Sequence, residues 1–286
     1  MSGPRPASPF AGTPAREAVR SAMTAIGAAG SPTARLDAEL LVAEVLGVPR
    51  ERLITDDGLR VDGASVRALQ DAVRRRAQTR EPIAYILGRR GFRDLELQVD
   101  RRVLIPRPET ELLVEIGLGL PRRTRVVDVG TGSGAVALAL KAERPDLRVL
   151  GSDISPDALD VARANAARLG LDVAFTRSDL LAGLEEEIDA VLANPPYVAE
   201  ADRAALVPEI TRHEPPLALF AGADGLELIR ALVAQAGARP GLRLLAVEVG
   251  AGQADAVAAL ALAAGFAATR RQLDLAGVER VVVAER

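Results

Sequence analysis

The sequence predicts an α/β fold, with a doubly wound, mostly parallel sheet preceded by a smaller helical domain. From Arg125 onward, short apolar runs typical of buried strands alternate with segments of helical periodicity. Such alternation places helices on both faces of a parallel sheet. Before that point, three apolar stripes have helical spacing, with glycine or proline loops between them. The expected strands are 125–129, 148–153, 172–177, 188–193, 242–248, 266–275 and 279–284.

The end of the chain predicts an antiparallel pair of strands. The last two expected strands flank Ala276-Gly277 with no helix between them. Earlier strands are separated by helices, expected near 134–143, 156–169, 224–237 and 252–264. A parallel sheet closed by an antiparallel final strand is the architecture of the Rossmann-like class I methyltransferases. We therefore expect a seven-stranded mixed sheet of that type.

The N-terminal third predicts three short helices. In the second helix, Ser31 should be the N-cap and Pro32 the first helical residue, and Gly47 should end the helix. The third helix should start after Asp62 and stop before Pro82. The apolar stripes of the three helices are Val19, Ala22, Met23 and Ile26, then Leu36, Leu40, Leu41 and Val45, then Val66, Leu69, Val73 and Ala77.

Four segments are expected along the chain. Residues 1–14 are rich in Pro, Ser and Gly and predict a disordered tail without an apolar signal core. Residues 15–80 should form the helical domain, which we expect to dock the substrate because its helices contain no obvious chemistry while ten arginines cluster where it meets the linker. Residues 81–107 should form a linker with a β-hairpin across 92–105, where apolar and polar residues alternate. Residues 108–286 should form the methyltransferase domain.

The composition excludes several classes of protein. The chain contains no cysteine, which excludes structural disulfides and thiolate metal sites. The most apolar stretch, 256–268, is shorter than the roughly 20 residues of a membrane helix. With the missing export signal, this predicts a cytoplasmic protein with no membrane partner. No cluster of ligand residues predicts a metal, and His213, the only histidine, is interpreted as a surface or packing residue.

Arginines are concentrated between residues 74 and 107. The net charge of −3 and the pI near 5.5 argue against a dedicated nucleic-acid binder, but this segment has ten arginines against four acids. Two interpretations stay open: a solvated helix and hairpin surface, or a docking patch for an acidic or nucleic-acid-bearing partner. The arginines are Arg74, Arg75, Arg76, Arg80, Arg89, Arg90, Arg93, Arg101, Arg102 and Arg107.

A glycine-rich loop follows the strand 125–129. Gly130, Gly132 and Gly134 alternate with Thr131 and Ser133 and lead into a helix. The backbone can therefore turn tightly, approach a ligand and present free N–H groups. The spacing differs from the Gly-x-Gly-x-x-Gly fingerprint of dinucleotide sites. A tight turn without a ligand is the alternative.

Two further strand ends should meet this loop. Asp153 ends the next strand, where an acid commonly accepts hydrogen bonds from ribose hydroxyls. Alternatively, it only helps to cap the helix that starts at Ser155-Pro156. Asp179 and Leu180 follow the third strand, where an adenine would lie. Because ligands bind outside the carboxyl ends of parallel strands, these ends should converge on one crevice.

The segment Asn194-Pro195-Pro196-Tyr197 follows the fourth strand and predicts methyl transfer to a planar nitrogen. The lone pair of an amide or aromatic amine is delocalised, so the group is a poor nucleophile. An enzyme can accept both of its N–H hydrogen bonds, direct the lone pair at the methyl group and exclude water. The Asn194 carboxamide oxygen and the Pro195 carbonyl suit this task, and Tyr197 offers a flat face. By itself, Asn-Pro-Pro could be a plain turn.

Several motifs occur together in a fixed order. They are Glu81-Pro-Ile-Ala-Tyr85-Ile-Leu-Gly88, Leu104-Ile-Pro-Arg107-Pro-Glu109-Thr-Glu111, Asp128-Val-Gly-Thr-Gly-Ser-Gly134, Asp153-Ile-Ser-Pro156, Asn194-Pro-Pro-Tyr197, Glu214-Pro-Pro-Leu-Ala-Leu219 and Asp224-Gly-Leu226. In this order they resemble the HemK/PrmC family of protein-glutamine methyltransferases, which act on peptide chain release factors. The resemblance covers roughly residues 15 to 286. Asn-Pro-Pro-Tyr alone is shared with nucleic-acid amino-methyltransferases.

The resemblance implies S-adenosylmethionine (AdoMet) as methyl donor, S-adenosylhomocysteine as product, and the glutamine of the release factors' Gly-Gly-Gln loop as acceptor. This modification modulates translation termination. The family's cofactor residues map onto Gly130 to Gly134, Asp153, the position of Leu180, and Asn194. Its glutamine-binding and catalytic residues map onto Asn194 to Tyr197. Relatives often have an aromatic residue at the Leu180 position, which stacks on adenine. Leucine keeps the apolar contact but lacks the stack, so the resemblance does not fix the affinity for AdoMet.

Two rival functions stay open. One is methylation of an exocyclic amine on DNA or RNA, against which the acidic pI and the lack of an added recognition domain argue. The other is a catalytically silent AdoMet-binding module, against which the intact Asn194–Tyr197 segment argues. We expect a monomer with no direct nucleic-acid substrate. The sequence assigns no role to Arg107 or Glu109.

Overall fold

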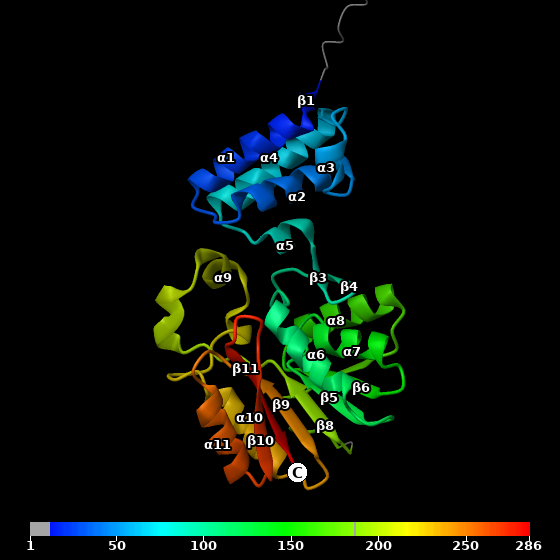
Figure 1. Ribbon diagram of the computed structural model, residues 1–286, viewed down its shortest axis with the longest axis vertical. Helices are drawn as coiled ribbons and strands as arrows, with labels where there is room; N and C mark the ends of the chain where they lie inside the picture. Colours follow the sequence, from blue (N-terminus) through cyan, green and yellow to red (C-terminus); the bar gives the residue numbers. More distant parts are fainter. Residues whose placement is uncertain (1–11, 186) are drawn as a thin grey trace, which may run out of the picture. The chain divides into compact units, whose positions relative to one another are not determined.

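The computed structural model describes residues 12–185 and 187–286, and the chain divides into two compact units at Leu87/Gly88 (Figure 1). The helical unit therefore extends beyond the expected boundary at residue 80. Most of the expected tail, residues 1–11, lies outside the described residues. The tail prediction is wrong for its end, because Thr13–Pro14 (β1) pairs antiparallel with Arg60–Val61 (β2) in the first unit.

The first unit contains the three expected helices and two short ones. Its core includes Ile26, Leu41 and Val42, which are almost fully buried. The longer helices pack against one another through most of the predicted apolar residues, although Leu36, Leu40 and Ala77 are not part of this core. The helices are α1 (Ala15–Ala28), α2 (Ala34–Leu46), α3 (Arg52–Thr55), α4 (Gly63–Gln78) and α5 (Ile83–Leu87).

The second helix departs from the sequence prediction at its start. It begins at Ala34, after Thr33, so Ser31 is not its N-cap. Leu36, expected on the apolar stripe, is 41% exposed, whereas Asp37 is buried. The apolar pattern is misleading here because a polar cluster turns the other face of the helix inward.

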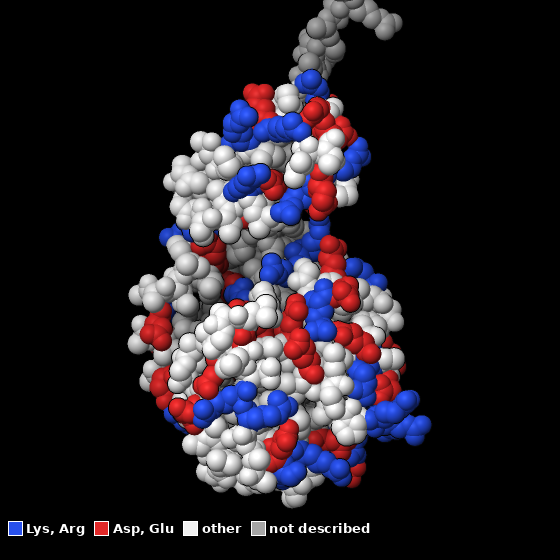
Figure 2. Space-filling view, viewed as in Figure 1, with Lys and Arg blue, Asp and Glu red and all other residues white. Residues whose placement is uncertain are grey.

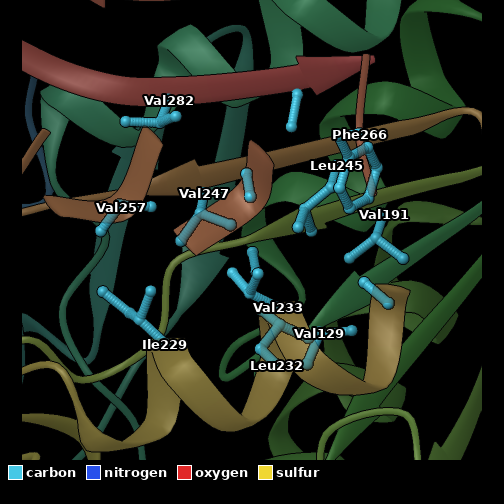
Figure 3. Close-up of a cluster of buried hydrophobic side chains, with 14 of the residues drawn as sticks. Val129, Val191, Ile229, Leu232, Val233, Leu245, Val247, Val257, Phe266 and Val282 are labelled. Atoms are coloured by element: carbon cyan, nitrogen blue, oxygen red, sulfur yellow. The ribbon is translucent and has the colours of Figure 1, made fainter. Parts of the chain in front are cut away.

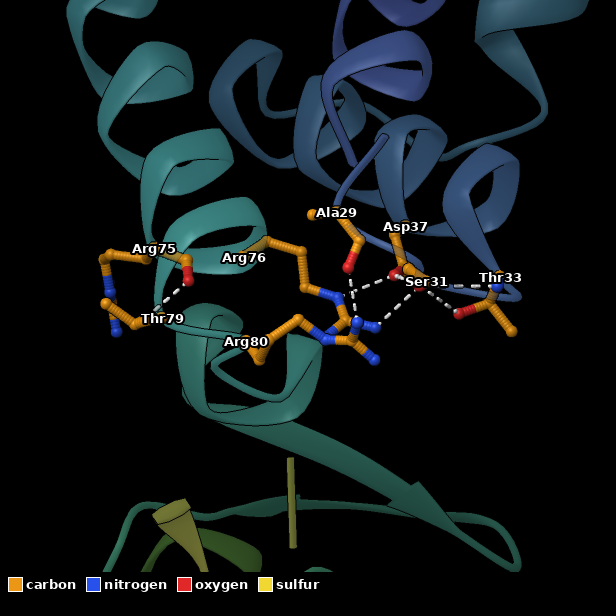
Figure 4. A network of polar contacts seen from close by, with 8 residues as sticks. All are labelled: Ala29, Ser31, Thr33, Asp37, Arg75, Arg76, Thr79 and Arg80. Atoms are coloured by element: carbon orange, nitrogen blue, oxygen red, sulfur yellow. Dashed lines mark hydrogen bonds and ion pairs between the residues drawn. The ribbon is translucent and has the colours of Figure 1, made fainter. Parts of the chain in front are cut away.

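This cluster is a buried ion pair that joins α2 to α4 (Figure 4). Arg76 Nε donates to Asp37 Oδ2 at 2.7 Å, and both side chains are 5% exposed. Ser31 Oγ donates to the same carboxylate at 3.0 Å and accepts from Arg76 Nη2 at 2.8 Å. Thr33 Oγ1 donates to Asp37 Oδ1 at 2.9 Å. Both oxygens of the buried carboxylate therefore have partners, as buried charge requires.

The second unit begins with a hairpin of β3 (Arg89–Phe92) and β4 (Leu95–Gln98). It is earlier and shorter than the expected 92–105, because the chain turns after Val99. The Val103 N–H donates to the Asp100 carbonyl at 3.0 Å, and the Arg102 N–H to Asp100 Oδ1 at 3.0 Å. These bonds close a turn in place of a second long strand.

The seven predicted strands and four predicted helices of the second unit are present, with boundaries that shift by at most three residues, whereas η2, α9 and η3 between β8 and α10 were not predicted. The strands are β5 (Arg125–Val129), β6 (Arg148–Asp153), β7 (Ala174–Arg177), β8 (Ala190–Ala193), β9 (Leu244–Glu248), β10 (Ala268–Leu273) and β11 (Glu279–Glu285). The helices are η1 (Pro108–Thr110), α6 (Glu111–Leu118), α7 (Ala135–Glu143), α8 (Pro156–Leu169), η2 (Glu200–Ala205), α9 (Pro208–His213), η3 (Pro216–Ala218), α10 (Glu227–Gly237) and α11 (Ala254–Ala263).

The seven strands form one mixed sheet in the order β10-β11-β9-β8-β5-β6-β7. The strands β9, β8, β5, β6 and β7 run parallel, and β11 is antiparallel to both of its neighbours. The predicted seven-stranded mixed sheet is confirmed. The final strand is inserted between β9 and β10 and does not form the edge.

Helices cover both faces of this sheet, and side chains alternate between two apolar cores. Along β8, Val191 and Ala193 join the core under α10 and α11, while Ala190 and Leu192 join the core under α6 and α7. Figure 3 shows the first of these cores, where Ile229 and other residues of α10 face the strands. Burial on both faces explains why the strands are continuous apolar runs in the sequence.

The strand order brings three chain segments together at the carboxyl ends of the central strands. From β5 the chain runs outward through β6 and β7, then returns to the other side of β5 as β8. In the register, Val129 lies level with Ser152 of β6 and with Ala193 of β8. The glycine loop, Asp153 and Asn194 therefore follow directly from adjacent strand ends, at the point where the strand order reverses.

Basic and acidic side chains are interspersed on the face shown in Figure 2. At least seven of the ten clustered arginines form ion pairs inside their own unit. Within the described part of the chain, no helix is long and apolar enough to cross a membrane.

We expect Asp37→Ala to destabilise the first unit by about 3–5 kcal/mol, because the substitution removes the buried carboxylate that pairs with the Arg76 guanidinium at 2.7 Å. Amide hydrogen exchange gives the free energy of opening of α2 and α4 and checks this value.

The matched control is Asp71→Ala, which removes the partner of Arg74 on the surface of α4, where the two side chains are 51% and 63% exposed. Its effect should stay within about 1 kcal/mol. Equal losses for the two variants would show that burial adds nothing to the Asp37–Arg76 pair.

Candidate active site

A pocket with an empty volume of about 910 Å³ opens at the carboxyl ends of the central strands. The predicted residues Gly130, Gly132, Asp153, Leu180, Asn194, Pro195 and Pro196 all line it. The predicted residues Thr131, Ser133, Gly134 and Tyr197 are not among the lining residues, and their contacts lie elsewhere.

The glycine loop is anchored from behind. The Gly130 and Thr131 N–H groups both donate to the Ser152 carbonyl, at 2.8 and 2.9 Å. Thr131 Oγ1 donates to Asp128 Oδ2 at 2.6 Å, and the Ala137 N–H donates to the same oxygen at 3.1 Å. Burial raises the pKa of Asp128 to about 6, against the effect of these bonds. Thr131 therefore holds the loop to the start of α7 and leaves the pocket face to glycine.

The second half of the loop shapes the turn into α7. Gly134 has a φ of +85° and precedes the helix, and a Cβ there would lie 2.9 Å from Leu138 Cδ1. Ser133 is buried, and its carbonyl accepts from Asn165 Nδ2 at 2.9 Å. At Gly132, by contrast, a Cβ would meet only the Gly130 carbonyl at 4.0 Å. The loop is thus packed on one side and open toward the pocket.

Asp153 ties the tip of β6 to the glycine loop. Its Oδ2 accepts the Gly132 N–H and its Oδ1 accepts the Ser155 N–H, both at 2.9 Å. Burial raises the pKa of Asp153, and these backbone bonds oppose the shift. The N-cap of α8 is Ser155, whose Oγ accepts the Ala158 N–H. Asp153 is therefore not the N-cap residue of this helix, and it also lines the pocket.

Leu180 adopts a backbone conformation that is rare for a residue with a bulky side chain. Its φ is +56°, in the left-handed region. Ser178 fixes the turn because its hydroxyl lies 2.9 Å from the Leu180 carbonyl and 2.7 Å from the Ala182 carbonyl. Strain of about 1–3 kcal/mol is typical of such positions, which cluster at ligand sites. Leu180 lines the pocket beside Asp153, where it offers apolar contact without a ring.

Asn194 belongs to a buried hydrogen-bond network that sequence reasoning missed. Asn194 Nδ2 donates to Thr110 Oγ1 at 3.0 Å, and Thr110 Oγ1 donates to Glu248 Oε2 at 2.7 Å. Tyr197 completes the network, since its hydroxyl lies 3.5 Å from Glu248 Oε1. Glu248 is 1% exposed, and burial raises its pKa to about 7. Burial and the charge of Glu248 raise the pKa of Tyr197 to about 12.

The segment after Asn194 is held by close backbone approach. A Cβ at Gly225 would lie 2.2 Å from the Tyr197 carbonyl oxygen, so only glycine fits there. Gln253 Nε2 donates to that carbonyl at 3.0 Å, while Gln253 Oε1 accepts the Gly250 N–H at 2.8 Å. These contacts, together with the two prolines, leave the Asn194–Tyr197 segment little freedom.

Arg107 joins two segments at the rim of the pocket. Its Nη2 donates to Glu214 Oε1 at 2.6 Å, and Glu214 Oε2 accepts the Ile105 N–H at 3.3 Å. The Glu214 side chain is 2% exposed, and its pKa is raised by burial against the lowering effect of Arg107. The rim residues that flank this pair are Arg102, Val103, Leu104, Pro215, Leu217 and Ala218.

Sequence signals for the missed residues existed but were weak. Glu248 ends an apolar strand at the same sheet edge as Asp153, which is the pattern that identified Asp153. Thr110 lies in the segment 104–111 but carries no chemical signature of its own. Among residues 12–185 and 187–286, no three His, Cys, Asp or Glu side chains are grouped so that they could hold a metal ion.

The fold and the pocket define a class I methyltransferase, an enzyme class that uses AdoMet. The Methyltransferase small domain family matches residues 108–215, and the PrmC N-terminal domain family matches residues 17–88. In fold, the chain is similar to the hMettl16 catalytic domain, solved in complex with the MAT2A 3'UTR hairpin 6. That likeness has a TM-score of 0.55 at 14% identity and covers 77% of this chain and 81% of that one, so it supports the fold alone.

Sequence relatives then identify the family. The chain is 43% identical to a release factor glutamine methyltransferase of Deinococcus radiodurans, over 95% of this chain and 98% of the relative. It is 42% identical to one of Rhodospirillum rubrum (90% and 81% covered) and 40% identical to one of Mycolicibacterium smegmatis (95% and 97%). The chain belongs to the release factor glutamine methyltransferase family.

We expect Glu248→Gln to stabilise the protein at pH 8. The folded state holds the Glu248 proton with a pKa of about 7, against an ordinary value of 4.5. The folded state therefore binds more protons than the unfolded state between these values, and stability falls as pH rises through them. Ionised Glu248 costs roughly 3 kcal/mol above pH 7. Denaturant unfolding at pH 5 and pH 8 should show a gain for Gln that is large only at pH 8.

Glu115→Gln is the control, because this α6 carboxylate is 58% exposed. It should change stability by less than about 0.5 kcal/mol at both pH values. A gain for Glu248→Gln that is the same at pH 5 and pH 8 would contradict the raised pKa.

Proposed function

We propose that this protein transfers the methyl group of AdoMet to the side-chain amide nitrogen of the glutamine in the Gly-Gly-Gln loop of peptide chain release factors. The observation that carries the proposal is the pair of acceptors at the pocket. Asn194 donates through Nδ2 to Thr110, and its Oδ1 accepts no hydrogen bond from any residue that the structure describes. The Pro195 carbonyl, next along the chain, is likewise available.

Two fixed acceptors suit a primary amide. When the glutamine amide donates one N–H to Asn194 Oδ1 and the other to the Pro195 carbonyl, its plane and lone pair are held in one direction. Orientation of this kind replaces the deprotonation that no side chain could perform. Bound AdoMet supplies an electrophilic methyl group on its sulfonium. Pro195, Pro196 and the buried network behind them exclude water from this side of the pocket.

The remaining pocket residues fit AdoMet. Gly130 and Gly132 leave open space along the loop, and Asp153 presents carboxylate lone pairs suited to ribose hydroxyls. Leu180, with Ile154 and Leu228, offers apolar contact for an adenine. We infer that the aromatic stack of other relatives is replaced by aliphatic contact. The substrate is part of the translation apparatus, so we place the enzyme in the cytoplasm.

Asp153→Ala should weaken AdoMet binding by about 2–4 kcal/mol, because it removes charge-assisted hydrogen bonds and frees the Gly132 N–H. Isothermal calorimetry measures this affinity. Asp157→Ala is the control, since this exposed residue in the first turn of α8 does not line the pocket. Unchanged binding by Asp153→Ala would remove Asp153 from the cofactor site.

Methylation of a purified release factor tests the function itself. With labelled AdoMet, we expect the label on the glutamine of the Gly-Gly-Gln loop, located by mass mapping. Asn194→Ala should lower the rate about 10²–10³-fold, as expected for the loss of one preorganised hydrogen bond. Its AdoMet affinity should fall much less. Label in nucleic acid and none in the release factor would overturn the proposal.

A further inference from the structure

When Glu248 is ionised, the pair Thr110 and Glu248 behind Asn194 has only one possible direction of hydrogen bonding. Glu248 accepts at Oε2 from Thr110, whose hydroxyl has a single proton. An ionised carboxylate can only accept, so this proton points toward Glu248. The Thr110 oxygen must then accept from its other neighbour, and the Asn194 amide supplies Nδ2–H at 3.0 Å. One charge thereby sets the direction of both bonds.

The direction matters because a carboxamide has two nearly identical orientations. Rotation about its last bond exchanges Oδ1 and Nδ2 with almost no change in shape. Only one orientation presents an acceptor to the pocket. In the other, the Asn194 NH₂ would face the NH₂ of the acceptor amide, and two donors repel. Shape and packing alone cannot choose between the orientations, but a hydrogen-bond partner of fixed polarity can.

We propose that Thr110 and Glu248 are positioning residues that hold the Asn194 carboxamide with Oδ1 toward the methyl acceptor. The inference rests on the proposed function, in which Asn194 Oδ1 accepts an N–H of the target glutamine. Neither residue lines the pocket. They act through Asn194, and 84 and 54 residues of chain separate them from it. The Thr110–Glu248 bond is short and buried, where such bonds are strong, and the Asn194–Thr110 bond is part-buried.

The direction of the hydrogen bonds from Asn194 through Thr110 to Glu248 depends on pH, because it depends on the protonation state of Glu248. Tyr197 lies at its second oxygen, Arg280 of β11 lowers its pKa, and Glu109 beside Thr110 raises it. A protonated Glu248 can donate to Thr110, which can then donate to Asn194 Oδ1 and turn the amide the wrong way. The correct orientation is enforced only when Glu248 is ionised. The rate should therefore rise with pH through about 7.

Thr110→Val against Thr110→Ser is the first test. Valine keeps the shape of threonine and removes the hydroxyl, whereas serine keeps the hydroxyl. We expect Thr110→Val to lower kcat on a release factor roughly 10–100-fold, less than the loss of Asn194 itself. Thr110→Ser should retain most of the activity, and AdoMet affinity should be unchanged in both. Equal kcat for Thr110→Val and the wild type would refute the inference.

A double-mutant cycle separates positioning from a general structural effect. In an Asn194→Ala background there is no amide to orient, so adding Thr110→Val should lower kcat no further. Additive losses would mean that Thr110 acts independently of Asn194.

Glu248→Gln gives a second check, because glutamine cannot ionise and can present either a donor or an acceptor to Thr110. Its kcat at pH 8 should be reduced and should not rise through pH 7, and a wild-type-like profile would overturn the role of Glu248.

Nuclear magnetic resonance tests the orientation without any substrate. The chain has two asparagines, Asn165 and Asn194, so ¹⁵N-asparagine labelling yields two side-chain NH₂ pairs. We expect the Asn194 pair to be protected from solvent exchange in the wild type and in Thr110→Ser, and to lose protection in Thr110→Val. The Asn165 pair, which donates to Gln98 and Ser133 carbonyls, reports that the fold is intact.

The two kinds of readout keep the two proposals apart. If the wild-type enzyme methylates no release factor, the proposed function fails, while the exchange of the Asn194 amide still decides whether Thr110 orients it. If the wild type is active but Thr110→Val leaves both the Asn194 exchange and kcat unchanged, the positioning role fails and the proposed function stands.

Discussion

The candidate site depends on the position of β5 between β6 and β8 in a parallel sheet. Parallel neighbours end at one edge, so the glycine loop, Asp153 and Asn194 meet although 64 residues of sequence separate the first from the last. The reversal of strand order on either side of β5 opens the crevice that these ends line. Backbone bonds then refine the arrangement, because Ser152 anchors the loop after β5 and Asp153 anchors its tip.

Buried and half-buried carboxylates recur behind the carboxyl ends of these strands, and each makes a different contact. Asp128 holds the glycine loop to α7, Asp153 joins two strand tips, Glu214 holds Arg107 across the rim, and Glu248 accepts from Thr110. Burial raises the pKa of all four. Such groups disfavour folding unless hydrogen bonds compensate them, and here the compensating donors are the segments that form the pocket. These carboxylates therefore lower the stability of the fold, and their hydrogen bonds hold the pocket loops in place.

The sequence predicted the strands and loops that short local segments define, and it missed the contacts between residues that are distant in the chain. Apolar runs located all seven strands, and the loop after β5 and the segment Asn194–Tyr197 were recognised from local spacing. The Asn194–Thr110–Glu248 network joins residues that no local pattern connects. The inward turn of Asp37 was missed for the same reason, since its partner Arg76 lies on another helix. Thr131, Ser133 and Gly134 belong to the predicted loop but face away from the pocket, a distinction that needs the backbone path.

The insertion of β11 between β9 and β10 has a consequence for synthesis of the chain. β11 is the last of the seven strands to leave the ribosome, yet Val281 and Val283 pack in one core and Val282 in the other. Until it emerges, β9 has an unpaired edge and β10 has no neighbour in the sheet. Unpaired edges invite pairing with other chains. A nascent chain of this protein is therefore exposed to aggregation until its final strand is complete, and the sheet closes in one late step.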